Sequence, residues 1–229
     1  LALIFFILCG IVLTSSFKSL LILFLGIEII SIPLYILTGS DKLNLKSNEA
    51  SLKYFLQGSF STGLMLMGIA FIYGDKGSFL TSVIAPLNGL PSALLLAGML
   101  LLLFSMAFKA SVAPFHFVLP DVYDGAPTVF TSFMATIVKA AVFVAFIRLF
   151  DEAFGLLRPE WKLFVAIIVV ATLFIGNITA VFQQSVKRML AYSSIAQAGF
   201  MLFALFALNN LAKEGLVLYS AAYSLASIG

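Results

Sequence analysis

Long apolar runs recur along the chain and constrain its fold more than any other feature. The run Leu94–Phe108 contains no charged residue, and the run Leu20–Leu37 contains a single one. Hydrophobic residues make up 62% of the sequence and charged residues 10%, whereas charged residues are about 25% of an ordinary soluble domain. Because apolar stretches of about 18 or more residues are typical of membrane-spanning helices, we expect an all-α polytopic membrane protein surrounded by the lipid bilayer.

The breaks between these runs predict about eight transmembrane helices. One of them is expected to be discontinuous near Lys109–Pro114 and to continue as a short half-helix at Phe115–Tyr123. Ser47 or Asn48 is expected to cap the third helix, and the longest connection is expected at Gly74–Leu90. The full helices are expected at Leu1–Ser16, Leu20–Leu37, Glu49–Tyr73, Pro91–Ala110, Pro127–Phe150, Trp161–Phe182, Met189–Leu208 and Lys213–Gly229.

Three charged side chains lie inside these apolar helices: Glu28, Lys109 and Lys139. At about 1.5 Å per residue, Glu28 and Lys139 lie near the middle of a hydrocarbon core about 30 Å thick. A charge at that depth costs at least about 2.5–3.5 kcal/mol, so three of them on a short chain indicate a function. In a proton-transfer chain, Glu28 would control whether Lys109 keeps its proton, and Lys139 would be the next acceptor. The alternative is a static Glu–Lys pair that fixes helix packing.

The break beside Lys109 favours the functional interpretation. Pro114 removes a backbone donor and leaves carbonyl groups near Ala110 unpaired. Unpaired backbone at membrane depth is tolerated only where it is buried in protein or faces water, so protons can gather there. His116, the only histidine, is a candidate relay because an imidazole can exchange protons near neutral pH. The alternative is a packed histidine that is hydrogen-bonded to a loop carbonyl.

The remaining residue types predict no cofactor site in this chain. Since Cys9 is the only cysteine and no second histidine exists, no metal site is expected, and Cys9 is expected to be a small buried side chain. Without a glycine-rich phosphate loop or a cysteine cluster, the sequence predicts neither a nucleotide site nor a redox centre. The net charge of +3 comes from loop residues and gives no indication of nucleic-acid binding.

Two further groups of polar residues have more than one interpretation. The seventh helix carries the hydroxyl groups of Tyr192, Ser193 and Ser194 and the amide of Gln197, and Ser193 and Gln197, four residues apart, share a face. They could hold a chain of waters or hydrogen-bond a neighbouring helix. A second group, Asp121 and Asp124, lies in a turn rich in proline and glycine and is expected to cap helices.

Four stretches of the sequence resemble the antiporter-like membrane subunits of respiratory complex I, a proton-conducting membrane transporter family. The most specific of them runs from Phe108 through His116 and includes Pro120–Pro127, with the sequence Pro-Asp-Val-Tyr-Asp-Gly-Ala-Pro. The other three are Leu25–Tyr35, Glu49–Phe55 and Lys187–Ile195. The resemblance extends over the whole chain.

This resemblance implies a fold made of two inverted five-helix repeats. Residues 1–150 would form the first repeat, family helices 4–8, and residues 151–229 would begin a second, truncated repeat with family helices 9–11. Glu28, Lys109 and Lys139 would correspond to the family's proton-translocating residues. Many relatives have a histidine where this chain has Gln197, and the ionisable group of the second repeat would lie beyond Gly229.

The same resemblance implies a non-redox subunit of a proton-translocating NADH:quinone oxidoreductase in the bacterial inner membrane. The chain would bind no cofactor itself, since NADH and quinone are used elsewhere in the complex, and its partners would be the other membrane subunits. One alternative is a subunit of a multisubunit cation/proton antiporter, which the Pro120–Pro127 stretch disfavours. Another is a structural membrane scaffold with static buried ion pairs.

Overall fold

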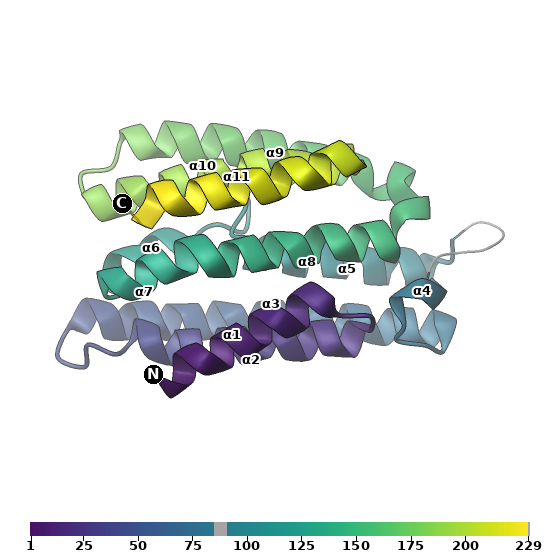
Figure 1. Ribbon diagram of the computed structural model, residues 1–229, viewed down its shortest axis with the longest axis horizontal. Helices are drawn as coiled ribbons and strands as arrows, with labels where there is room; N and C mark the ends of the chain where they lie inside the picture. Colours follow the sequence, from purple (N-terminus) through teal and green to yellow (C-terminus); the bar gives the residue numbers. More distant parts are fainter. Residues whose placement is uncertain (85–90, 229) are drawn as a thin grey trace.

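The computed structural model describes residues 1–84 and 91–228, mostly as helices. In chain order these are α1 (Ala2–Ser16), α2 (Leu20–Thr38), α3 (Leu45–Lys76), α4 (Thr81–Ile84), α5 (Ala93–Lys109), α6 (Val118–Gly125), α7 (Thr128–Phe133), the π-helical stretch η1 (Met134–Val138), α8 (Lys139–Glu152), the 3-10 turn η2 (Gly155–Leu157), α9 (Arg158–Val181), α10 (Val186–Ala207) and α11 (Asn210–Ile228). The long helices run along the long axis of the molecule (Figure 1).

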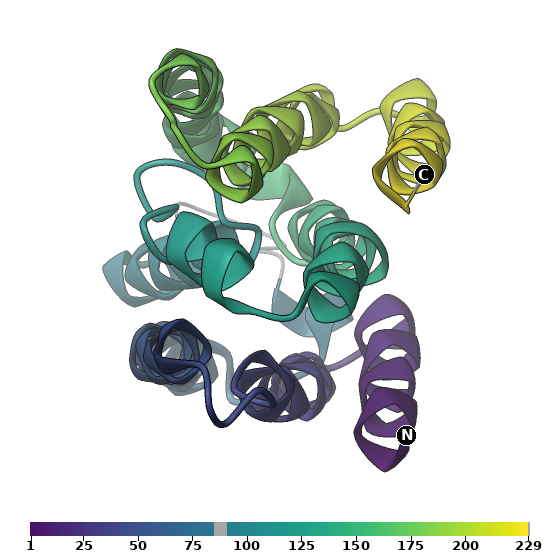
Figure 2. The ribbon, with the colours of Figure 1, turned by 90° about the vertical axis from the view of Figure 1, so that its left-hand side faces the viewer.

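Seen end-on, the helices form three layers (Figure 2). Helices α1, α2 and α3 form one outer layer, α5, α6 and α8 lie in the middle, and α9, α10 and α11 form the other outer layer. The middle layer therefore contains both Lys109, at the end of α5, and Lys139, at the start of α8.

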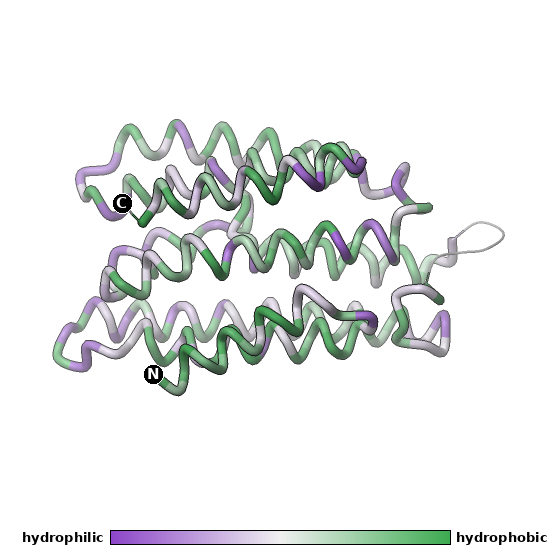
Figure 3. Tube along the Cα trace, viewed as in Figure 1, coloured by the Kyte–Doolittle hydropathy of each residue, from purple (hydrophilic) through white to green (hydrophobic). Residues whose placement is uncertain are grey.

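Within residues 1–84 and 91–228, five helical segments are long and apolar enough to cross a membrane, judged by their length and composition. Hydrophobic residues dominate these helices, and hydrophilic residues gather at the helix ends and in the connections (Figure 3). The shorter helices α1 and α5 are also apolar. The expected all-α polytopic membrane fold is confirmed. The five segments are Leu20–Thr38, Leu45–Lys76, Thr128–Glu152, Gly155–Val181 and Val186–Ala207.

The structure confirms the discontinuous helix, but its second half begins later than expected. Helix α5 ends at Lys109, and α6 begins at Val118 rather than at Phe115. The intervening backbone turns tightly, because the Phe115 N–H donates to the carbonyl of Val112 at 2.8 Å. Pro120 then falls in the first turn of α6, where a missing backbone N–H is tolerated.

The third helix also differs from the expectation, since α3 begins before Glu49. The side chain of Asn44 caps it by accepting a hydrogen bond from the backbone N–H of Lys46 at 3.0 Å. The expected caps Ser47 and Asn48 therefore lie inside the helix.

Three other expectations were partly wrong. The connection expected at Gly74–Leu90 contains the short helix α4, and its residues 85–90 lie outside the described part of the chain. The helix expected at Pro127–Phe150 is interrupted by η1, for which the sequence carries no signal. The last helix begins at Asn210 instead of Lys213, while its expected end, Gly229, lies outside the described residues. The division of the chain at residue 150 into two repeats stays a prediction.

Close backbone contacts fix the helix pairs that carry the site. A Cβ atom added to Gly68 of α3 would lie 2.9 Å from the carbonyl oxygen of Gly98 on α5. Small residues at such positions let helix backbones approach closely, which is how membrane helices gain packing energy. On α1 the same kind of contact is made by Gly10, whose added Cβ would lie 2.9 Å from the carbonyl oxygen of Gly26 on α2. Its neighbour Cys9 is exposed, contrary to the expected burial.

Candidate functional site

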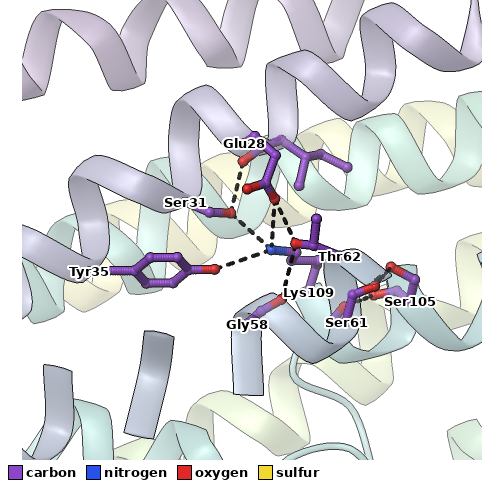
Figure 4. Close-up of polar contacts among 9 residues, drawn as sticks. Glu28, Ser31, Tyr35, Gly58, Ser61, Thr62, Ser105 and Lys109 are labelled. Carbon is purple, nitrogen blue, oxygen red and sulfur yellow. Dashed lines mark hydrogen bonds and ion pairs between the residues drawn. The ribbon is translucent and has the colours of Figure 1, made fainter. Parts of the chain in front are cut away.

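Glu28 and Lys109 come together between α2 and α5 (Figure 4). The Lys109 ammonium nitrogen, Nζ, lies 3.7 Å from Oε1 of Glu28. It also donates to Oγ of Ser31 at 3.0 Å and to the Tyr35 hydroxyl at 3.5 Å. Little of the Lys109 side chain is exposed, 9% against 20% for Glu28. The two charges are therefore close enough, and shielded enough from water, to attract each other strongly.

The third helix α3 completes this site from the opposite side. The hydroxyl group of Thr62 lies 2.7 Å from Glu28 Oε1, to which it can donate, and 3.0 Å from the carbonyl of Gly58. One hydroxyl hydrogen serves one acceptor at a time. Thr62 can therefore stabilise the Glu28 carboxylate in one orientation and release it in the other.

A pair of serines holds α3 and α5 together one turn away from Lys109 (Figure 4). Ser105 Oγ donates to the carbonyl of Ser61 at 2.9 Å, and Ser61 Oγ lies 3.2 Å from both the hydroxyl and the carbonyl of Ser105. Both side chains are fully buried. This reciprocal contact fixes the level of Lys109 along the bundle relative to Thr62.

Several backbone N–H groups between α5 and α6 are hydrogen-bonded to other groups of the protein. Ser111 adopts a left-handed conformation with φ of 57°. The N–H of Ala113 donates to the hydroxyl of Thr172 on α9, at 3.0 Å, and Thr172 is fully buried. The break is thus stabilised from the far layer, as irregular backbone at membrane depth requires.

His116 lies in this break, and its side chain is 5% exposed. Its ring stacks on Phe117 and meets the ring of Tyr192 edge-on at 6.3 Å between centroids. Its Nδ1 atom has no hydrogen-bond partner among the described residues. The two interpretations of His116, as a relay and as a packed side chain, therefore both stay predictions.

Lys139 occupies a second buried site between the middle layer and α10. Its Nζ donates to the carbonyl of Ser194 at 2.7 Å and lies 2.5 Å from the Ser194 hydroxyl. The Tyr223 hydroxyl donates to the same Ser194 oxygen at 2.9 Å, and the Tyr223 ring lies 5.8 Å from Nζ. Lys139 directly follows the π-helical stretch η1, a rare structure that is frequent at functional sites.

One cavity connects the two lysines. It has a volume of about 50 Å³ and is lined by both Lys109 and Lys139. Since a water needs about 10–15 Å³ of such space, there is room for a few waters. Tyr54 of α3 and Tyr123 of α6 also line this cavity, among otherwise mostly apolar side chains. The structure thus brings Lys109 and Lys139 to one cavity, with Glu28 beside Lys109.

Gln197 does not reach the lysines. Its side-chain oxygen accepts a hydrogen bond from Tyr219 on α11. Together with Ser193 it lines a different cavity of about 470 Å³, so the two residues do share a face of α10. Gln197 therefore hydrogen-bonds a neighbouring helix, which is one of its two expected interpretations.

The acidic residues of the Pro120–Pro127 stretch form ion pairs instead of helix caps. Asp121 accepts from Lys53 of α3 and from Arg188 of α10, each at 2.7 Å. Asp124 accepts from Ser185 at 3.0 Å and lies 3.8 Å from Lys46. The expected capping role was wrong because α6 ends where α3 and α10 begin, which brings three charged helix ends together.

Several of these contacts have partial signals in the sequence. Ser31 and Tyr35 follow Glu28 by three and seven residues, the spacing of one helix face, so they could have been found. Thr62 and Tyr223 carry no such signal, because they meet the site from distant helices. Within residues 1–84 and 91–228, no group of three or more histidine, cysteine or acidic side chains is arranged to hold a metal ion.

The chain matches a family of membrane proteins over most of its length. A family model described as "NADH:quinone oxidoreductase/Mrp antiporter, TM" matches residues 18–229. NADH-quinone oxidoreductase subunit N of Cytophaga hutchinsonii is 46% identical over 227 residues, which are 99% of this chain and 50% of the relative. The subunit N of Trichlorobacter lovleyi is 42% identical over 224 residues, 96% of this chain and 46% of the relative. The chain spans about half the length of the curated relatives it matches.

Solved structures agree with this match. A chain of respiratory complex I from Thermus thermophilus has a TM-score of 0.84 and 37% identity, covering 99% of this chain and 49% of that chain. A chain of the Mrp complex from Dietzia sp. has a TM-score of 0.88 at 20% identity, covering 98% of this chain and 42% of that chain, which supports the fold alone. The protein is a multi-pass protein of the bacterial inner membrane. It belongs to the NADH:quinone oxidoreductase/Mrp antiporter transmembrane family.

Proposed function

We propose that this chain moves protons across the membrane as a non-redox subunit of an NADH-quinone oxidoreductase of the complex I type. In this proposal NADH and quinone react in other subunits, and the other membrane subunits of the complex are the partners. The chain itself would act as part of a translocase and would bind neither substrate. The relatives named subunit N support this assignment.

The observation that carries the proposal is the cavity lined by both lysines, with Glu28 beside the first of them. A lysine buried in an apolar environment keeps its proton more readily when a carboxylate lies close by. If the Glu28 charge were neutralised or drawn away, Lys109 would release its proton into the cavity. The waters that the cavity can hold would carry the proton to the neutral amine of Lys139, and the resulting ammonium would donate hydrogen bonds to the carbonyl and hydroxyl oxygens of Ser194.

Alanine variants of Glu28 and Lys109 in the assembled complex test this mechanism. Proton pumping per electron, measured in vesicles during NADH oxidation, is expected to fall in Glu28→Ala and in Lys109→Ala while the complex still assembles. Lys18→Ala, at an exposed turn, is the matched control and should pump normally. Normal pumping by both assembled variants would refute the mechanism.

Two alternatives predict different outcomes of the same experiment. If the buried charges serve only as a structural scaffold, Lys109→Ala should reduce assembly and leave pumping per assembled complex intact. A subunit of a cation/proton antiporter is also compatible with the family description, which names both classes. It predicts sodium-dependent proton movement in vesicles without NADH, whereas our proposal predicts none.

A further inference from the structure

The cavity of about 470 Å³ between α7, η1, α10 and α11 is not used by the proposed lysine pathway. Lys187 in the first turn of α10 and Ser227 in the last turn of α11 both line it, and these turns lie at the same end of the bundle (Figure 1). Its inner part reaches Ser194, the partner of Lys139. The wall is rich in groups that can bind water, namely Thr128, Thr131, Ser132, Ser193, Ser194 and Gln197.

A single side chain is common to this second cavity and the lysine cavity. Among the residues that the structure describes, Tyr123 alone lines both. Lys139, which lines the first cavity, also hydrogen-bonds to Ser194, which lines the second. The two cavities therefore meet at the Tyr123 side chain and at this hydrogen bond.

Tyr123 is held firmly in this position. It is 4% exposed, and its carbonyl accepts a hydrogen bond from Thr131 at 3.3 Å. The ion pairs of Asp121 and Asp124 tie α6 to its neighbours on either side of Tyr123 in the sequence. A Cβ atom on Gly125 would lie 2.5 Å from a backbone oxygen of α3, so the backbones of α6 and α3 are in close contact there. Tyr123 therefore lies in a tightly packed segment.

We propose that the Tyr123 ring is the barrier that keeps water of the second cavity apart from Lys109 and Lys139. With the ring in place, water of the second cavity does not reach the lysines directly, and Lys139 touches that cavity only through its hydrogen bond to Ser194. Without the ring the two cavities would merge, and the lysines would be in contact with the solvent at one end of the bundle. The barrier is a geometric property of the fold. Its consequence for pumping rests on the proton-translocating function proposed above.

Cysteine accessibility in the intact complex tests the barrier without reference to pumping. In a Cys9→Ser background, Val138→Cys reports on the lysine cavity and Ser193→Cys on the second cavity. The probe is methanethiosulfonate ethylammonium, a small water-soluble thiol reagent, added to membrane vesicles. We expect Ser193→Cys to react whatever residue occupies position 123. Val138→Cys should react at least about tenfold faster when Tyr123→Ala is added.

Two control variants isolate the role of the ring. Tyr123→Phe keeps the ring and should leave labelling of Val138→Cys slow. Tyr73→Ala removes a ring from the far end of α3 and should also leave it slow. Tyr123→Val provides a second ring deletion if Tyr123→Ala assembles poorly. Fast labelling of Val138→Cys with Tyr123 intact, or no acceleration in either ring deletion, would overturn the proposal.

Pumping measurements then separate the barrier from the function. In Tyr123→Ala we expect proton pumping per electron to fall at least about twofold while NADH oxidation continues, because the lysines would stay in contact with the solvent at one end of the bundle. Accelerated labelling together with normal pumping would uphold the barrier and count against the proton-translocating role of the lysines. If Val138→Cys is labelled slowly in the ring deletions while Lys109→Ala pumps less, the barrier proposal is refuted and the proposed function is not.

Discussion

Replacing Thr62 by valine is the most direct test of how Glu28 is controlled. Valine has nearly the shape of threonine but has no hydroxyl group, so it removes the 2.7 Å hydrogen bond to Glu28 Oε1 with little change in packing. The carboxylate keeps its contact with Lys109 at 3.7 Å. The variant therefore changes the balance between the paired and the separated states of Glu28 and Lys109 without removing either charge.

The magnitude follows from the type of bond and its surroundings. Interhelical hydrogen bonds in a membrane protein contribute about 0.6 kcal/mol on average and at most about 1.7 kcal/mol. A hydrogen bond to a charged group contributes about 1.5–3 kcal/mol. Since Glu28 is charged and its side chain is 20% exposed, we take about 1.5 kcal/mol, where the two ranges meet. That corresponds to about a tenfold change in the equilibrium that Thr62 controls.

The assay compares Thr62→Val with Thr62→Ser, which keeps the hydroxyl group. The rate of proton pumping in vesicles should fall severalfold in Thr62→Val and stay near the normal value in Thr62→Ser. In a Glu28→Gln background the valine substitution should have little further effect, because the charged acceptor is already absent. If Thr62→Val pumps like Thr62→Ser, or if its effect is equally large in the Glu28→Gln background, the reasoning is refuted.

Three other substitutions give sharp expectations. Gly125→Val should prevent assembly, since a Cβ atom there would lie 2.5 Å from a backbone oxygen. Gly63→Val should assemble, because nothing lies within 4 Å of a Cβ atom at that position. Immunoblots of the purified complex measure assembly. Ser105→Ala should cost about 0.6–1.7 kcal/mol, and adding Ser61→Ala should cost little more, as measured by the thermal stability of the complex. Asp121→Asn should lower the midpoint of thermal unfolding by a few degrees, because two ion pairs of about 0.2–1 kcal/mol each are lost.

Hydropathy predicted the long helices, and Pro114 predicted the broken one among them, whereas the short helix α4 and the π-helical stretch η1 were not predicted. Glu28, Lys109 and Lys139 could be identified because burying a charge in the membrane costs free energy. This cost depends on how deep in the membrane the residue lies, which its position within an apolar run indicates. Whether these residues meet depends on which helices are neighbours, which hydropathy does not encode. The 3.7 Å pair of Glu28 and Lys109 therefore needed the three-dimensional structure.

For contacts at long sequence separation, the sequence did not indicate the partner. A bond from Ser194 to a neighbouring helix was one of two expected alternatives, but its partner Lys139 lies 55 residues away. The ion pairs of Asp121 were misread for a related reason. In the sequence, Asp121 stands in a turn-like context, and its partners Lys53 and Arg188 lie 68 and 67 residues away.

The break between α5 and α6 has a consequence for the speed of the site. Both arms are fixed, α5 by the Ser61–Ser105 contact and by Gly68 against Gly98, and α6 by its ion pairs at the bundle end. The helices on either side of this segment are therefore fixed relative to each other. The motions left to it are side-chain rotations and rearrangements of water, which take picoseconds to nanoseconds. Proton transfer through this segment should therefore be insensitive to the viscosity and thickness of the lipid, unlike transport by proteins that rock whole domains.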